Sequence, residues 1–400
     1  MTMMMTTTTR VTRRPEGRSL NRLANLVARG RGTRAFLALA HFCVLVGLGS
    51  LACHAPTPSS RSKDFDELAT LEGTAIAVAD PRELVYVASG LDEAQLDELR
   101  TLAPNVRFLV GLRGEELASA LETAHGADAH LLRTNAETSA NNLRWAQAWS
   151  AGVDRYVANP LWARDGGPLL TNMAGVHGPA IADHVMAMLL SRIKNLDRWR
   201  DAMREGAWDR SRAEGMTSLA GKTLLVCGLG GIGTEVARRA KAFDMRVVAT
   251  VRTLRDAPPF VDELGTDEAF ERFLGEADVI AICLPLTEAT RDLFDRDTLG
   301  RVKPGAILVN IARGPIVDTD ALIAALDDGR LSAACLDVTD PEPLPTDHPL
   351  WQRDDVLITP HVAGRAEVTG ERRWALFREN VRRFANGLPL LNVVDPASGY

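Results

Sequence analysis

The sequence predicts an α/β protein with two doubly wound parallel sheets. With 400 residues the chain exceeds one typical domain, so two domains are expected, each large enough for its own core. Two series of short apolar runs alternate with polar, helix-compatible stretches, which is the pattern of parallel strands joined by helices. Residues 178–210 lie between the two series and repeat apolar positions at helical spacing. These observations together predict two α/β domains with a helix between them.

The first series begins near residue 72 and predicts the first sheet. Its runs are short and apolar, as expected for strands that are covered on both faces. They are "TAIAVA" (74–79), "LVYVAS" (84–89), "VRFLVG" (106–111), "AHLL" (129–132) and "LRWAQAW" (143–149).

The stretch from 178 to 210, "GPAIADHVMAMLLSRIKNLDRWRDAMREGAWDR", predicts one long helix. Pro179 stands near its expected first turn, where proline is tolerated. We interpret this helix as a domain connector or a dimer arm.

The second series follows this helix and predicts the second sheet. Its runs are "KTLLVCGLGGIG" (222–233), "MRVVATV" (245–251), "DVIAICLP" (278–285), "AILVNIA" (306–312), "SAACLDV" (332–338) and "DVLITPH" (355–361).

The N-terminal 60 residues differ from the rest of the chain. Residues 1–34 carry eight arginines and one acid, and residues 35–52 carry no charge, which matches a signal peptide or a short anchor followed by a linker. Cys53 follows Leu51 and Ala52, as at a bacterial lipoprotein cleavage site. We therefore expect export or membrane attachment through residues 1–53. A start codon assigned too early, in front of a cytoplasmic enzyme, is the open alternative.

Charge and cysteine usage exclude two classes of function. Beyond residue 34 the chain carries a net charge of about −13, which argues against a nucleic-acid partner. Cys227, Cys283 and Cys335 lie inside apolar runs without CxxC spacing. We predict that they are buried free thiols and that the protein holds no metal.

A glycine-rich turn in the second series predicts a dinucleotide site. In "LLVCGLGGIGTEVARRA", Gly228, Gly230 and Gly233 form GxGxxG directly after a predicted strand and before a predicted helix. Such glycines allow a tight turn, close approach of a pyrophosphate, and packing of the helix on the strand. The helix N-terminus then faces the phosphate charge. We therefore predict a Rossmann domain that binds NAD or NADP.

The end of the next strand favours NADP over NAD. NAD-binding domains usually place an acid there to accept a hydrogen bond from the ribose 2′-hydroxyl. In "MRVVATVRT" the corresponding residues are Val251 and Arg252. An arginine can pair with a 2′-phosphate, and Arg255 could assist. The open alternative is that Arg252 is a solvated loop residue and that the enzyme uses either cofactor.

Three later motifs contain residues suited to acid–base chemistry and to binding a carboxylate. "VNIARGPIVD" contains Arg313, whose planar guanidinium suits a carboxylate beside a carbonyl. "ITPHVAG" contains His361, and histidine is the usual general acid near neutral pH. "CLDVTDPEPLP" contains Asp337 and Glu342. A carboxylate on the far imidazole nitrogen would fix the tautomer and favour the charged form.

These motifs, in this order after the glycine turn, resemble the D-isomer-specific 2-hydroxyacid dehydrogenase family from about Glu72 to Val394. The resemblance implies an NAD(P)-dependent 2-hydroxyacid dehydrogenase, or 2-oxo acid reductase, that forms a homodimer. It also implies that a Rossmann cofactor domain, residues 178–364, is inserted in a flavodoxin-like substrate domain, residues 72–177 plus 365–394.

The resemblance assigns roles to individual residues. Arg313, Glu342 and His361 would be catalytic, with Glu342 on the imidazole of His361. The backbone amides of Ala151 and Gly152, with Arg313, would bind the substrate carboxylate. The cofactor would contact Gly231 and Ile232 at the pyrophosphate, Leu284 and Pro285 at the adenosine, Ile311 and Ala312 at the nicotinamide, Asp337 at the carboxamide, and Gly364.

Several functions stay open within this resemblance. Glu342 argues against formate as substrate, because formate dehydrogenases have glutamine there. The stretches "GVHGPAIADHV" and "TVRT" are more similar to glyoxylate, hydroxypyruvate and general 2-oxo acid reductases than to phosphoglycerate dehydrogenases. A phosphoglycerate dehydrogenase-type activity is one alternative. A catalytically idle NAD(P)-binding dimer that acts as a sensor is the other.

Overall fold

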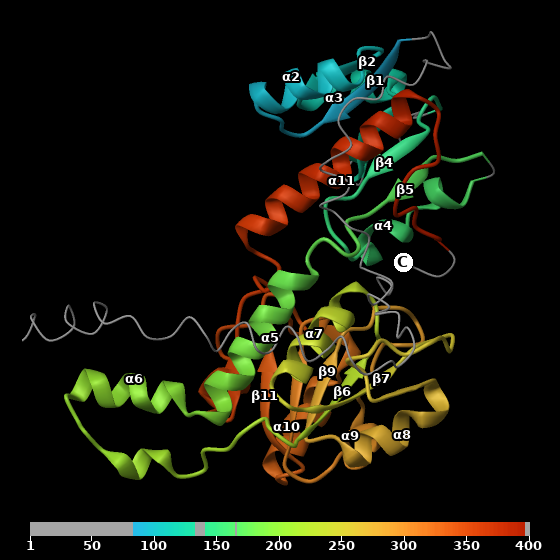
Figure 1. The fold of residues 1–400 in the computed structure, drawn as a ribbon. Coiled ribbons are helices and arrows are strands. Elements are labelled where there is room, and N and C mark those ends of the chain that lie inside the picture. The colour runs from blue at the N-terminus through green and yellow to red at the C-terminus, as the bar shows by residue number, and fades with distance from the viewer. Residues whose placement is uncertain (1–82, 133–140, 165, 397–400) are drawn as a thin grey trace, which may run out of the picture. The chain divides into compact units, whose positions relative to one another are not determined.

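The computed structural model describes residues 83–132, 141–164 and 166–396, and these form two parallel sheets covered by helices (Figure 1). This confirms the predicted fold class. The predicted signal or anchor segment, residues 1–60, and the first predicted strand, residues 74–79, lie outside the described residues. Within the described ranges, no helix has the length and apolar character needed to cross a bilayer.

The first sheet has the strand order β2-β1-β3-β4-β5, and all its pairs are parallel. This 2-1-3-4-5 order is that of flavodoxin-like folds. The elements of this part of the chain are β1 (Leu84–Ala88), α2 (Glu93–Leu102), β2 (Val106–Val110), α3 (Gly114–Thr123), β3 (Gly126–Asp128), η1 (Ala129–Leu132), β4 (Trp145–Gln147), α4 (Asp154–Val157), η2 (Pro160–Ala163) and β5 (Leu169–Thr171).

In this region one strand prediction was wrong and one edge strand was missed. The run "AHLL" forms the 3-10 helix η1, and the strand β3 lies just before it. Ala129 and Leu132 are buried without joining the sheet, so their apolar character reflects packing alone. The edge strand β5 was not predicted, because three residues are too few to give a periodic signal.

The second sheet has the strand order β12-β11-β10-β9-β6-β7-β8, again with only parallel pairs. The order reverses between β6 and β9, at the crevice where doubly wound sheets bind ligands. Its strands are β6 (Thr223–Cys227), β7 (Arg246–Thr250), β8 (Glu263–Gly265), β9 (Val279–Ile282), β10 (Ala306–Asn310), β11 (Leu331–Leu336) and β12 (Val356–Ile358). The three-residue edge strand β8 was also not predicted.

The predicted long helix is two helices, α5 (Gly178–Ile193) and α6 (Leu196–Glu205). The break lies at Asn195, whose φ of 52° is left-handed, a conformation that asparagine tolerates better than most residues. The Asn195 side chain donates to the carbonyls of Arg212 and Glu214 at 3.2 and 2.9 Å, which holds the turn. Helical spacing continued through the break, so the pattern could not reveal it.

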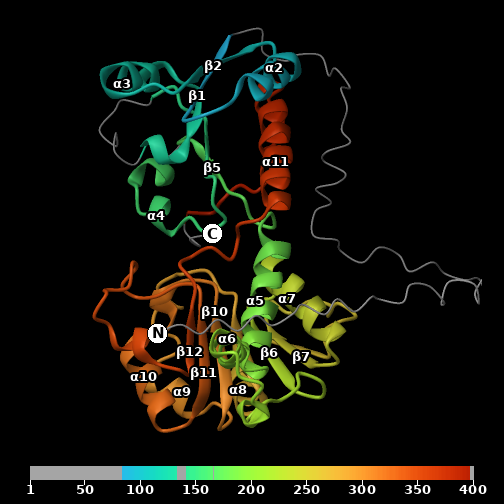
Figure 2. The same cartoon turned by 90° about the vertical axis from the view of Figure 1, so that its left-hand side faces the viewer.

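The chain has further helical segments, most of them beside the two sheets. They are η3 (Arg210–Ala213), α7 (Gly231–Ala242), α8 (Asp267–Glu276), α9 (Arg296–Gly300), η4 (Gly314–Ile316), α10 (Thr319–Asp327), η5 (Pro349–Gln352) and α11 (Glu367–Ala385). Helix α5 packs on α7 beside the second sheet. Although α11 follows the second sheet in sequence, it packs on the first, where Phe377 contacts Tyr86 and Trp145 (Figure 2). The predicted domain boundaries stay a prediction.

Candidate active site

The glycine turn joins β6 to α7 and forms one side of a cavity. Gly228 has a φ of 93°, and a Cβ there would lie 3.0 Å from the Cys283 carbonyl oxygen. A Cβ on Gly233 would lie 2.1 Å from the Gly228 carbonyl oxygen, so this glycine lets α7 pack against the turn. At Gly230, the N-cap of α7, a Cβ would meet no atom within 4 Å. Backbone amides beside open space at a helix N-terminus are suited to a pyrophosphate.

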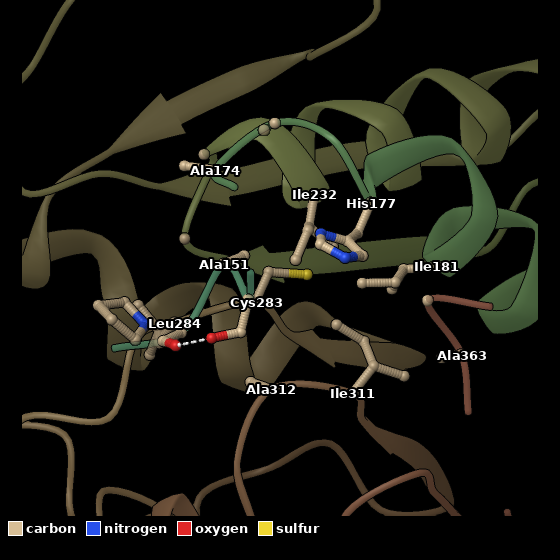
Figure 3. Close-up of a pocket in the computed structure, with 18 of the residues that line it drawn as sticks. Ala151, Ala174, His177, Ile181, Ile232, Cys283, Leu284, Ile311, Ala312 and Ala363 are labelled. Atoms are coloured by element: carbon tan, nitrogen blue, oxygen red, sulfur yellow. Dashed lines mark hydrogen bonds between the residues drawn. The ribbon is translucent and has the colours of Figure 1, made fainter. Parts of the chain in front are cut away.

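The cavity has a volume of about 1000 Å³, which can hold a large ligand. Figure 3 shows Ile181, Ile232, Leu284 and Ile311 on its walls, so much of its surface is apolar. Most predicted site residues line it: Ala151, Gly152, Gly228, Gly230, Gly231, Ile232, Arg252, Leu284, Pro285, Ile311, Ala312, Arg313, Asp337, His361 and Gly364. Gly233 and Glu342 lie behind the lining, Gly233 against the turn and Glu342 against His361.

His361 and Glu342 form a hydrogen-bonded pair, with 2.8 Å between Nδ1 of His361 and Oε1 of Glu342. His361 lies beyond the end of β12 and has a φ of 54°. Its backbone N–H donates to the carbonyls of Asp337 and Thr359 at 2.8 and 3.0 Å, which holds this unusual conformation. The side chain is 46% exposed and faces the cavity, so Nε2 is the nitrogen left for a ligand.

Asp337 anchors the loop that carries His361. Its side chain is 2% exposed and accepts three hydrogen bonds: from the Thr359 hydroxyl at 2.6 Å, and from the backbone N–H groups of Val362 and Ala363 at 2.9 and 3.0 Å. A buried carboxylate needs such donors to offset the cost of burial. Its predicted contact with a carboxamide stays a prediction, and the structure adds this role in holding the loop.

Arg313 lies in the turn after β10, and its guanidinium is held by two acceptors. Nε donates to Oδ1 of Asp154 at 3.0 Å, and Nη1 donates to the Ala312 carbonyl at 2.7 Å. A Cβ on Gly152 would lie 1.6 Å from Nη2 of Arg313, so only glycine lets the guanidinium lie against this loop. The structure therefore brings Arg313 into direct contact with the segment that contains Ala151 and Gly152, its predicted partners in substrate binding.

Two arginines lie at the other end of the cavity. Arg252 and Arg255 follow β7, and both line the cavity. Arg255 donates from Nη2 to the carbonyl of Leu229 in the glycine turn at 2.5 Å. Arg255 thus contacts the turn, where a phosphate would lie, and Arg252 lines the same cavity.

Several lining residues were not predicted from the sequence. They are Trp149, His177, Thr369, Arg373 and, as a wall residue, Cys283. Cys227 and Cys335 are buried as predicted, whereas Cys283 is only partly buried because it stands at the cavity wall after β9. Burial raises the pKa of the Cys283 thiol to about 12, so it is an unreactive wall group. Trp149 lies two residues before the predicted Ala151, but no motif marked Thr369 or Arg373.

Comparison with known proteins identifies relatives for nearly the whole described region. The family model described as D-isomer specific 2-hydroxyacid dehydrogenase, NAD binding domain, matches residues 186–363. A glyoxylate reductase from Korarchaeum cryptofilum is 35% identical over 264 residues, which is 64% of this chain and 77% of that protein. A D-3-phosphoglycerate dehydrogenase from Archaeoglobus fulgidus is 31% identical over 325 residues, which is 78% of this chain and 59% of that protein.

The solved structures include a similar fold with a bound dinucleotide. A D-isomer specific 2-hydroxyacid dehydrogenase from Xanthobacter autotrophicus Py2, in complex with NADPH and MES, aligns with a TM-score of 0.64 and 30% identity. The alignment covers 80% of this chain and all of that chain. By contrast, this chain spans about half the length of the phosphoglycerate dehydrogenases that it matches.

Proposed function

The chain belongs to the D-isomer specific 2-hydroxyacid dehydrogenase family, and from this premise we propose that it interconverts 2-oxo acids and D-2-hydroxy acids with NAD or NADP. The observation that carries the proposal is the convergence of three groups on one cavity. These are the His361–Glu342 pair, Arg313 against the loop at Gly152, and the glycine turn. An acid, a carboxylate clamp and a phosphate cradle are the parts that this reaction requires.

His361 performs the proton transfer in this proposal. When bound, the nicotinamide supplies a hydride for reduction and accepts one for oxidation. As C2 of the 2-oxo acid gains the hydride, Nε2–H of His361 gives a proton to the carbonyl oxygen, so that one C–H and one O–H bond form. Glu342 holds Nδ1 and stabilises the imidazolium form. In the reverse direction, neutral His361 takes the hydroxyl proton.

Arg313 orients the substrate in this proposal. Its guanidinium and the backbone amides of Ala151 and Gly152 bind the carboxylate at C1, while Asp154 keeps the guanidinium in place. The backbone amides at Gly230 and Gly231 hold the pyrophosphate of the dinucleotide, and Ile311 and Ala312 border its nicotinamide.

The acid–base role of His361 has a direct test. Replacing His361 with asparagine should lower kcat by about a hundredfold or more, because the proton donor is lost. Initial rates should be measured with glyoxylate, hydroxypyruvate, pyruvate and longer 2-oxo acids. The exposed His130, outside the cavity, offers the matched control variant His130→Asn. A His361→Asn enzyme with near-normal kcat would refute the role, and a wild type that binds NADPH but reduces no 2-oxo acid would favour the sensor function.

For the cofactor we propose a preference for NADP. Arg252 and Arg255 beside the turn support it, because guanidinium groups pair with a 2′-phosphate. Replacing Arg252 with aspartate should move the ratio of kcat/KM values from NADPH toward NADH. An unchanged ratio would retire this preference.

We also propose that the protein is a homodimer and that residues 1–53 direct export or membrane attachment. The dimer is supported by the exposed apolar side chains at α6 and beyond, with Met203 73% and Trp208 91% exposed. Light scattering after size-exclusion chromatography should give twice the mass of one chain.

Cell fractionation tests the proposal that residues 1–53 direct export or membrane attachment. Full-length protein in the soluble cytoplasm would contradict it.

A further inference from the structure

Three polar side chains at the cavity have buried atoms that make no hydrogen bond within the described part of the chain. These atoms are Nδ1 of His177, Oγ1 of Thr369 and Nε of Arg373. His177 caps the start of α5, and the other two residues belong to the first turns of α11. Thr369 is 5% exposed, so solvent does not compensate its hydroxyl. Buried polar atoms are nearly always paired in folded proteins, so three such atoms at one cavity indicate a ligand.

Arg373 is held in position by an aromatic wall. Its guanidinium carbon lies 5.2 Å from the ring centroid of Trp149, within the range of a cation–π contact. The indole N–H of Trp149 donates to Oδ1 of Asp128 at 2.9 Å, and Asp128 is buried. Asp128 also accepts from the Tyr86 hydroxyl at 2.9 Å and from the Ser89 hydroxyl at 2.7 Å. The indole is therefore fixed, and it leaves the edge of the guanidinium for another partner.

The charge of this cluster is unbalanced. Among the described residues, no carboxylate lies within ion-pair distance of Arg373, which stays charged at any ordinary pH. Burial and the nearby Arg373 lower the pKa of His177 to about 4, so His177 is neutral near pH 7. The three side chains thus carry one positive charge together with a hydroxyl and a neutral imidazole. This combination suits a ligand group with a single negative charge, such as one carboxylate.

The cluster lies close to Arg313 and to the segment that carries His361. Trp149, which contacts Arg373, and Gly152, which contacts Arg313, are three positions apart, at most about 11 Å of chain. A Cβ on Gly364 would lie 3.2 Å from Cδ2 of His177, and Gly364 is the third residue after His361. A substrate whose C1 carboxylate binds Arg313 would therefore extend its side chain along residues 149–152 toward Arg373.

We propose that Trp149, His177, Thr369 and Arg373 form an anion subsite that binds a carboxylate on the substrate side chain, so that the preferred substrates are dicarboxylic 2-oxo acids. This inference rests on the proposed function. In the subsite, Nε–H and one Nη–H of Arg373 donate to the two carboxylate oxygens, and the Thr369 hydroxyl donates to one of them. A phosphate would bring a second negative charge that the cluster does not balance, and a hydroxyl would leave the charge of Arg373 without a partner.

The experiment compares pairs of substrates that differ in one carboxylate. 2-Oxoglutarate is matched with 2-oxovalerate, and oxaloacetate with 2-oxobutyrate, at saturating NADPH with the wild-type chain. The dicarboxylate of each pair should have a kcat/KM at least about tenfold higher, because a charge-assisted hydrogen bond is among the stronger single contacts. 3-Phosphohydroxypyruvate is included, and its use in preference to both dicarboxylates would overturn the assignment to a carboxylate.

Variants then test the side chains. Arg373→Leu should lower kcat/KM for 2-oxoglutarate by about thirtyfold or more and leave that for 2-oxovalerate within twofold. Thr369→Val, which keeps the shape of the side chain, should act in the same direction with a smaller loss. Arg372→Leu is the matched control on the same helix, because Arg372 does not line the cavity, and it should change neither value. An equal loss for both substrates in Arg373→Leu would show a structural role only and would overturn the proposal.

Binding separates this proposal from the proposed function. Calorimetric titration of 2-oxoglutarate into the protein with bound NADP⁺, which cannot donate a hydride, should give an affinity that falls by at least tenfold in Arg373→Leu. If no 2-oxo acid is reduced but this Arg373-dependent binding is seen, the subsite is supported and the proposed function fails. If monocarboxylic 2-oxo acids are reduced and 2-oxoglutarate neither binds nor reacts better than 2-oxovalerate, the proposed function holds and the subsite is refuted.

Discussion

The two walls of the cavity are built in different ways. The cofactor wall, residues 228–232, is one turn between a strand and a helix, and its fit depends on backbone atoms and the absence of side chains. The substrate wall, residues 149–152 with His177, Thr369 and Arg373, collects side chains from three separate segments. The first wall lies in one local sequence pattern, whereas in the second wall only Ala151 and Gly152 were predicted as site residues, and no motif marks Thr369 or Arg373. The part of the substrate wall that we propose to select the side chain of the substrate is therefore not visible in local motifs.

The walls also differ in what an added methyl group would strike. At Gly228 and Gly233, in the glycine turn, it would meet a backbone carbonyl oxygen, whereas at Gly152 it would meet the end of the flexible Arg313 side chain. We therefore expect damage to the fold in the first case and damage to catalysis alone in the second.

The largest effect is expected for Gly233→Ala. The new Cβ would lie 2.1 Å from the Gly228 carbonyl oxygen, so α7 would have to move away from β6. NADPH affinity should fall by more than about a hundredfold, with a clear loss of thermal stability, because overpacking commonly costs about 1–3 kcal/mol. Fluorescence titration and circular dichroism melting measure both. Gly230→Ala is the control, because its Cβ meets no atom within 4 Å, and it should keep the wild-type Tm. Equal Tm values for Gly233→Ala and Gly230→Ala would refute the claim that the close contact at Gly233 determines the stability of the turn.

The next effect is expected for Gly152→Ala, where the Cβ would displace Nη2 of Arg313. Because the guanidinium can swing aside, the Tm and the NADPH affinity should stay near wild type. The kcat/KM for 2-oxo acids should fall by about a hundredfold, since a misplacement of about 1 Å can cost this much. Steady-state kinetics and melting curves separate the two outcomes. A lower Tm with unchanged kcat/KM would show that an added methyl group damages the fold at the substrate wall as it does at the glycine turn.

Asp154 gives a smaller effect, because it acts through Arg313. Asp154→Asn keeps an acceptor near Nε of Arg313 but removes the charge, which weakens the contact now measured at 3.0 Å. We expect KM for the 2-oxo acid to rise about tenfold while kcat changes little, as for loss of uniform binding. Asp154→Glu should restore part of the affinity. A fall in kcat at constant KM would assign Asp154 a role in the chemical step instead.

The same contrast explains how much the sequence could predict. Gly228, Arg313, Glu342 and His361 stand in short motifs, each next to a strand end, so their positions and the parallel sheets followed from pattern. The pairing of Arg313 with Asp154 and of Trp149 with Arg373 joins residues more than 150 positions apart, and no local pattern encodes such contacts. The break at Asn195 was also hidden, because apolar spacing continued across it.

The smallest effect is expected for His177. It concerns how the free energy of unfolding depends on pH, and it tests whether this buried side chain of the substrate wall destabilises the fold. Burial, with the nearby Arg373, lowers its pKa from 6.5 to about 4, so below pH 6.5 the unfolded chain binds more protons than the folded one. Stability should therefore fall as the pH drops from 6.5 toward 4, by about 1 kcal/mol between pH 8 and pH 6.

The variant His177→Asn has no titrating group, so its free energy of unfolding should lose less on the same change of pH. Denaturant unfolding at pH 8 and pH 6 gives the difference between the two proteins, and His130→Asn is the control with an exposed histidine. If the wild type and His177→Asn lose the same stability, His177 does not titrate with a lowered pKa in the fold. A smaller loss in His177→Asn would mean that this wall keeps a destabilising buried imidazole, whereas the glycine turn fits its ligand with backbone alone.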